Sequence, residues 1–186
     1  MPLSPPAERE ALHNRDIAIR GYLRADGLVD VEAQLTDTKT YSFSNEHRGE
    51  IAAGEPLHGM WLRMTVDDKL NIVACEAATD YAPWTPCPAA APNFRRLAGL
   101  RIKPGFLRDA LARVDGPEGC THIRELLQQV ATTAYQTIYS VRMKQGVRMD
   151  DAPILLDTCL ACASDSPLVA NRWPHLYRPK ETEPAE

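Results

Sequence analysis

Alternating apolar and polar residues run through the first third of the chain. Apolar side chains occupy every second position in 17–23 and again in 29–35, where charged or amide residues stand between them. Asp26-Gly27 separates the two stretches and favours the tight turn of a β-hairpin. A period of two is typical of half-buried strands. The pattern therefore predicts a pair of antiparallel strands, with folded structure beginning near Asp16.

Three further strands are predicted over 38–44, 57–66 and 70–74. In the second of these, Met60 and the apolar residues after it lie on one face, which His58 shares. Residues 45–55 are rich in polar side chains and contain two glycines, so we expect a loop there. Together the strands indicate an antiparallel meander with one buried face.

Helical spacing begins after Pro104-Gly105. A short helix is predicted over 106–114, and a long one of about 24 residues, ~36 Å in length, starts at His122 and ends at Gly146. Four prolines in 79–92 predict an ordered loop, and 154–156 is expected to form a last strand.

The expected fold class is α+β: an antiparallel β-meander of five to six strands packed against a long C-terminal helix and a shorter helix. We expect one domain over 16–178, between flexible tails at 1–15 and 179–186.

Composition narrows the function classes. The chain has 186 residues, a net charge of −4 and scattered basic residues, so a nucleic-acid partner is not expected. No apolar run approaches the ~20 residues of a membrane span, and the N-terminus does not resemble a signal peptide. Five cysteines at irregular spacing indicate reduced thiols and a cytoplasmic location.

The start of the long helix concentrates reactive side chains. Cys120 stands just before the helix, Thr121 is a suitable N-cap, and His122 and Glu125 share a helix face. We expect the helix dipole to lower the pKa of His122 and Glu125 to oppose that shift and orient the ring. His58 is predicted to converge on this site, so that His122, Glu125, His58 and Cys120 form a catalytic group within about 10 Å of a common point.

A polar stripe continues along the same helix through Gln129 and Gln136. It is either a solvated helix face or the lining of a pocket between helix and sheet. In the second interpretation Gln129 and Gln136 bind the substrate, and the aromatic side chains of Tyr81, Trp84 and Trp61 wall the pocket.

Several motifs occur together in one order. They include Pro56-Leu57-His58-x-Met60-Trp61, Cys87 after a proline-rich run, Gly119-Cys120-Thr121-His122-x-x-Glu125-Leu126, and Asp157-x-Cys159-x-Ala161. On these motifs the chain, from Ile17 to Trp173, resembles the bacterial domain-of-unknown-function family 2889. The resemblance draws attention to His122, Glu125 and Gln136 and implies no settled activity. The family pattern often has histidine where Leu160 stands.

Cysteine and histidine spacing raises the alternative of a metal site. Cys87, Cys120, His122 and Cys159 form the set that fits the family positions, and Cys159-x-x-Cys162 with Cys120-x-His122 forms another. The cysteines could equally be small buried hydrophobic residues. Cys120 could also act as a nucleophile, with His58 as its base. We therefore expect either no cofactor or a single zinc ion.

The combined interpretation is a small cytosolic enzyme without a nucleotide cofactor, a lyase or hydrolase that uses histidine and glutamate on a small substrate, with an aromatic substrate left open. No Walker, Rossmann or nucleophile-elbow motif is present in the sequence. The alternatives are a zinc or iron–sulfur protein and a non-catalytic interaction module. The expected partner is a small molecule, with a homodimer left open and no membrane partner.

Overall fold

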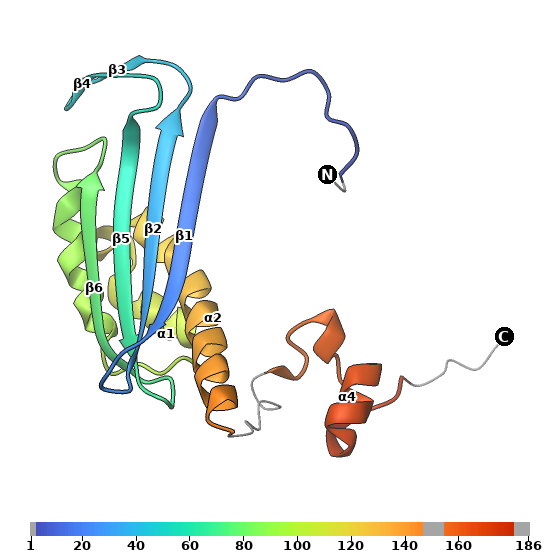
Figure 1. The fold of residues 1–186 in the computed structure, drawn as a ribbon. Coiled ribbons are helices and arrows are strands. Elements are labelled where there is room, and N and C mark those ends of the chain that lie inside the picture. The colour runs from blue at the N-terminus through green and yellow to red at the C-terminus, as the bar shows by residue number, and fades with distance from the viewer. Residues whose placement is uncertain (1–2, 147–154, 181–186) are drawn as a thin grey trace. The chain divides into compact units, whose positions relative to one another are not determined.

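Four long strands form one antiparallel sheet in the computed structural model, which describes residues 3–146 and 155–180 (Figure 1). The sheet order is β1-β2-β5-β6, and the strands are β1 (His13–Leu23), β2 (Val29–Lys39), β5 (Pro56–Val66) and β6 (Ile72–Tyr81). A separate hairpin of β3 (Phe43–Asn45) and β4 (Gly49–Ile51) is inserted between β2 and β5. The α+β class and the antiparallel strands are confirmed.

Several strand boundaries differ from the sequence-based expectation, among them that of β6, which was predicted over 70–74 and runs from Ile72 to Tyr81. The predicted strand over 38–44 is divided, because β2 continues to Lys39 and β3 begins at Phe43. The loop predicted over 45–55 contains β4, whose Ile51 is buried and pairs with Phe43. The strand expected over 154–156 is not present at Leu155 and Leu156, and Ile154 lies outside the described residues.

Helices cover one face of the sheet (Figure 1). They are α1 (Phe106–Val114) and the 24-residue α2 (Thr121–Lys144). The 3₁₀ segment η1 (Cys87–Leu97) precedes α1, and a second one, η2 (Gly116–Glu118), lies between α1 and α2. Part of the predicted proline-rich loop is therefore helical. The buried face of α2 is the predicted one: it runs from Ile123 to Ile138 at helical spacing. Gly21 of β1 lets α2 approach closely, because a Cβ there would collide with the side chain of Thr137.

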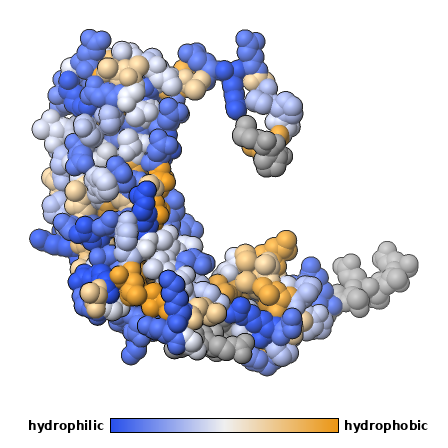
Figure 2. All heavy atoms as spheres, viewed as in Figure 1, coloured by the Kyte–Doolittle hydropathy of each residue, from blue (hydrophilic) through white to orange (hydrophobic). Residues whose placement is uncertain are grey.

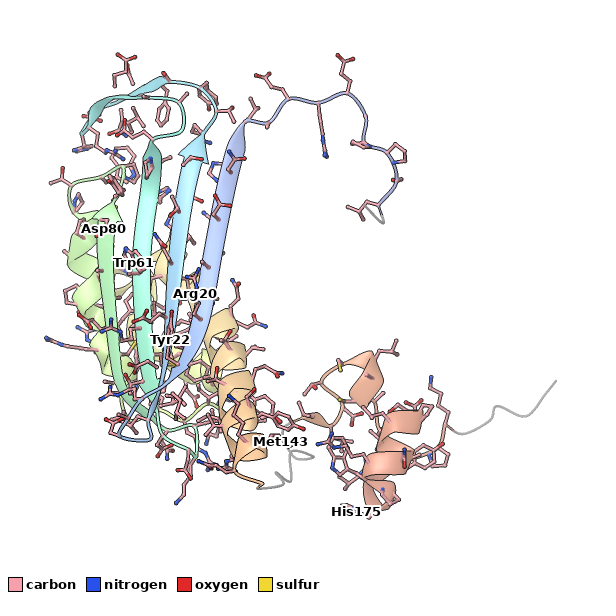
Figure 3. The ribbon with its side chains drawn as sticks, in the orientation of Figure 1. Arg20, Tyr22, Trp61, Asp80, Met143 and His175 are labelled. Atoms are coloured by element: carbon pink, nitrogen blue, oxygen red, sulfur yellow. The ribbon has the colours of Figure 1, made fainter. Side chains whose placement is uncertain are left out.

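The opposite face of the sheet is polar. Figure 2 shows it as mostly hydrophilic, and its side chains pair across strands, as in the ion pair between Arg63 and Glu32. Trp61 and Asp80 lie on this face (Figure 3), where the indole N–H donates to the carboxylate at 2.7 Å. Within the described residues, no helix is long and apolar enough to cross a membrane. Only one sheet face thus contributes to the hydrophobic core, as the alternation predicted.

The chain divides into two compact units, Met1–Val141 and Arg142–Glu186. The second unit contains η3 (Leu160–Cys162), α4 (Pro167–Arg172) and η4 (Pro174–Leu176). Val169 and Trp173 form its small core, against which Leu155, Leu156 and Leu176 pack. The single domain expected over 16–178 stays a prediction, although β1 already begins at His13, inside the expected N-terminal tail. Of the C-terminal tail, residues 181–186 lie outside the described part.

Candidate functional site

A polar row crosses three neighbouring strands at the end of the sheet. Strand register places Arg15 of β1 opposite Asp37 of β2, and Asp37 opposite His58 of β5. Asp37 follows Leu35 by two positions and therefore points to the same helix-covered face as the apolar side chains of β2. Its side chain is only 1% exposed. The sheet thus holds a carboxylate at the edge of the hydrophobic core.

Asp37 is the centre of the cluster. Arg15 donates to both of its oxygens, from Nε to Oδ1 at 2.7 Å and from Nη2 to Oδ2 at 2.8 Å. His58 Nδ1 lies 3.0 Å from Oδ2, and His122 Nε2 lies 3.6 Å from the same oxygen. His13 Nε2 is 3.4 Å from Oδ1. One buried carboxylate therefore faces an arginine and three imidazole rings.

The charge state of Asp37 follows from these contacts. Burial alone would raise the pKa of its carboxyl group, but the hydrogen bonds and charge of Arg15 outweigh burial and lower the pKa to about 2. Asp37 is consequently ionised throughout the neutral range. Arg15 is shared with a second carboxylate, since its Nη1 donates to Glu125 Oε2 at 2.5 Å.

The two site histidines lie ring against ring. The centroids of His58 and His122 are 3.8 Å apart and the planes are inclined by 31°. Burial lowers the pKa of both rings, helped by the neighbouring ring at His58 and by Arg15 at His122. Both are therefore mainly neutral near pH 7. Because like charges at this separation repel, the pair takes up its two protons in coupled steps.

A cavity of about 580 Å³ opens beside the two rings. His58 and Met60 of β5 form one side, and the turn from Gly119 to His122 forms another. The third side is the proline-rich stretch 83–93. Gly119 permits the tight turn before α2, because a Cβ there would collide with the carbonyl oxygen of Val114.

The structure brings together three of the four predicted catalytic residues. His58, Cys120 and His122 all line the cavity. Glu125 is not among its lining residues: its side chain is 53% exposed and bonds to Arg15 instead of His122. Its charge still raises the pKa of His122, as expected, whereas burial takes the place of the helix dipole as the chief lowering cause. The carboxylate that lies beside His122 is therefore that of Asp37, where Glu125 was expected.

The predicted substrate-binding residues have mixed positions. Trp84 lines the cavity and contacts the ring of His47 edge-on. Tyr81, at the end of β6, lies under the guanidinium of Arg48 and does not line this cavity. Trp61 faces the other side of the sheet (Figure 3).

The polar stripe of α2 is largely a solvated face. Gln129 and Gln136 are exposed and line no part of the cavity. Thr121, expected to precede the helix as its cap, is the first helical residue. His122 lines the cavity and lies 3.6 Å from Asp37, whereas Gln129 and Gln136 do neither.

A metal site of cysteine and histidine was one alternative from the sequence, and the described residues offer a different group. Asp37, His58 and His122 present ligand atoms that all lie within 4.8 Å of one another. A tetrahedral zinc ion with Zn–N distances of about 2.0–2.1 Å would hold two imidazole centroids roughly 5 Å apart. The rings here are closer, and Arg15 already occupies both oxygens of Asp37. This arrangement favours hydrogen-bonded imidazoles.

The predicted set of cysteine ligands is only partly assembled. Cys87, Cys120 and His122 line the same cavity. Cys159 belongs to the second unit, and the four-residue set therefore stays a prediction. All five cysteines lie in the described residues, and none forms a disulfide.

Sequence reasoning missed Asp37, Arg15 and His13. A signal for Asp37 was present: the alternation of 29–35 continues by one more step to this residue, so a period of two places a carboxylate on the buried face. Arg15 likewise precedes Ile17 by two positions. A charged residue on the buried face of a strand requires an oppositely charged or hydrogen-bonding partner, and this requirement could have indicated the cluster.

Residues 13–136 match the family model described as "Protein of unknown function (DUF2889)". No significant match was found among curated proteins or among solved structures. The matched segment covers every residue of the Asp37 cluster and ends before the second unit begins at Arg142.

Proposed function

Because the chain belongs to the DUF2889 family, whose description gives no activity, we propose a function from the site alone. The protein is a small cytoplasmic enzyme, a hydrolase or lyase, in which His58 acts as general base. The observation that carries this proposal is the 3.0 Å contact between His58 Nδ1 and the buried carboxylate of Asp37, beside a cavity.

The contact with Asp37 selects the useful tautomer of His58. A carboxylate accepts hydrogen bonds, so Nδ1 carries the proton and donates it to Oδ2. Nε2 then keeps its lone pair and can take a proton from a substrate hydroxyl, a carbon acid or water. The imidazolium that forms lies against the ionised Asp37, and the new charge is stabilised where it appears.

His122 has a complementary role. As a neutral ring it can donate one N–H to a carbonyl oxygen and stabilise negative charge that develops there. Its closeness to His58 makes simultaneous protonation of both rings unfavourable. Proton uptake by His58 therefore keeps His122 neutral and in its donor role. Cys120 and Thr121 add two polar side chains to the same wall.

The cavity favours a small, flat, largely apolar substrate. Its volume of about 580 Å³ lies in the range of small-molecule sites. Proline and alanine side chains line most of the wall opposite the histidines, and Trp84 offers a ring for stacking. We therefore propose an aromatic compound with a carbonyl or ester group next to the ring system.

Two probes separate hydrolase from carbon-acid chemistry. Hydrolysis of 4-nitrophenyl acetate is followed by absorbance, and exchange of the acidic protons of phenylpyruvate with deuterium is followed by NMR. In either arm, His58→Gln should lower the rate about a hundredfold, within the usual contribution of a general base. The rate should rise with pH through a midpoint below 6.5 and level off above it, because the base must be neutral.

His175→Gln is the matched control, since His175 is an exposed histidine of the second unit. It should keep the wild-type rate. Equal rates in wild type and His58→Gln, with both proteins folded by circular dichroism, would refute the assignment of His58.

A single zinc ion bound by Asp37, His58 and His122 is the second candidate, favoured by the 4.8 Å clustering of their ligand atoms and opposed by the 3.8 Å separation of the two rings. Metal analysis after dialysis against zinc distinguishes the two. Stoichiometric zinc in wild type that is lost in both His58→Gln and His122→Gln would support the metal centre. Equal, substoichiometric zinc in all three proteins would support acid–base chemistry.

A further inference from the structure

The second unit carries a pair of cysteines that the proposed acid–base site does not use. Cys159 is exposed, whereas Cys162 is 7% exposed, and neither forms a disulfide. Three positions separate them across η3, for which Cys159 is the N-cap residue. The hydrogen bond from the Cys162 N–H to the Cys159 carbonyl closes residues 159–162 into one tight turn. The turn therefore brings the two cysteines near each other.

Hydrogen bonds hold this turn in shape. The Cys162 N–H donates to the Cys159 carbonyl at 3.0 Å, and the Asp157 N–H donates to the Cys162 carbonyl at 2.9 Å. Asp157 Oδ1 accepts from the Ser164 N–H at 2.7 Å, and Ser166 Oγ donates to the Ala161 carbonyl at 2.8 Å. These hydrogen bonds thus fix the backbone on both sides of the cysteine pair.

Hydrogen bonding from Cys162, its backbone N–H first, lowers the pKa of the exposed Cys159 thiol. Leu160 between them is 92% exposed and offers an apolar contact beside the accessible sulfur.

We propose that Cys159 and Cys162 form a redox-active dithiol that exchanges with a disulfide-bearing partner such as glutathione disulfide. The Cys159 thiolate attacks one sulfur of the partner, the partner S–S bond breaks, and one partner thiolate leaves with the electron pair. Cys162 then loses its proton to solvent and attacks the Cys159 sulfur. The mixed disulfide breaks, a Cys159–Cys162 bond forms, and the second partner thiolate leaves. Two protein thiols are oxidised and one partner disulfide is reduced.

The burial of the two cysteines fits these roles. Exposed Cys159 can be reached by the partner, and buried Cys162 can be reached only by a group already attached to Cys159. This activity is independent of the acid–base site, since no residue of the Asp37 cluster takes part.

The full-length protein, fully reduced and then freed of reductant, is mixed with glutathione disulfide at pH 7. Remaining thiols are alkylated with N-ethylmaleimide, and the products are read by intact mass and peptide mapping. Wild type should lose two alkylatable thiols together, carry no glutathione and yield a peptide with a Cys159–Cys162 bond. Cys162→Ser should stop with one glutathione on Cys159. Cys159→Ser should react at least about tenfold more slowly at Cys162.

Cys87→Ser controls for loss of a thiol elsewhere and should form the same Cys159–Cys162 bond as wild type. Wild type that retains glutathione on Cys159 as long as Cys162→Ser does would overturn the proposal. So would a disulfide that joins Cys159 to a different cysteine. Hydrolysis of 4-nitrophenyl acetate, measured in parallel, should be the same in wild type and Cys162→Ser, so the two proposals fail separately.

Discussion

Replacement of Asp37 by asparagine removes the charge around which the site is built while nearly preserving its shape. A carboxyl pKa lowered from 3.8 to about 2 corresponds to about 2 kcal/mol of stability at neutral pH. Loss of one partner of a buried ion pair costs about 3–5 kcal/mol. Arg15 is 32% exposed and keeps Glu125, which reduces that cost. We therefore expect Asp37→Asn to lower the free energy of unfolding by about 2–3 kcal/mol at pH 7.

Urea unfolding at several pH values tests this magnitude. Because the folded-state pKa of Asp37 lies below the unfolded value, its contribution is complete above about pH 4 and declines as the pH falls towards 2. The difference between wild type and Asp37→Asn should decline over the same range. Asp16→Asn, the same change at an exposed neighbour, should stay within about 0.5 kcal/mol of wild type. Equal urea midpoints for wild type and Asp37→Asn at pH 7, with equal m-values, would refute the reasoning.

Three further predictions follow from burial and close packing. The pKa values of His58 and His122 are lowered by burial, so the unfolded chain binds protons first as the pH falls below about 6.5. The urea midpoint of wild type should therefore decline between pH 7.5 and 5, and that of His122→Gln should decline less. An equal decline of the midpoint in both proteins would contradict this. Gly21→Ala should lower the melting temperature, because the new Cβ collides with the Thr137 side chain at a cost of about 1–3 kcal/mol. Adding Thr137→Ala to the same chain should restore part of the lost melting temperature. A wild-type melting temperature for Gly21→Ala alone would be the opposing result. Burial raises the pKa of Cys75 to about 12, so iodoacetamide at pH 8 should modify it in urea but not in the native protein, as mass spectrometry can show.

Local periodicity predicted the elements that position the site. The alternation in 29–35 and 57–66 predicted β2 and β5, and the spacing after Gly119 predicted α2, so His58 and His122 were assigned to the correct faces. The pairing of β2 with β5 across an inserted hairpin is a tertiary property, and the alternation carries no information about it. For that reason the opposition of Asp37 and His58 was not predicted.

Glu125 contacts a residue distant in the sequence in place of the helix neighbour that its spacing predicted. Its spacing from His122 predicted a contact on one helix face. Arg15, 110 residues earlier in the chain, offers a full opposite charge and takes the carboxylate instead. Gln129 and Gln136 are exposed and line no part of the cavity, whereas His122 of the same helix lines it.

His58 and His122 should both be neutral imidazoles at pH 7, held beside one ionised carboxylate. Proton NMR of the ring Cε1–H signals, assigned with His58→Gln and His122→Gln, measures both pKa values directly. Both midpoints should lie below 6.5 in wild type and fall further in Asp37→Asn, because the Asp37 charge raises the pKa of each ring. A midpoint at or above 6.5 for either histidine, or values unchanged by Asp37→Asn, would show that the two rings are not held neutral beside Asp37.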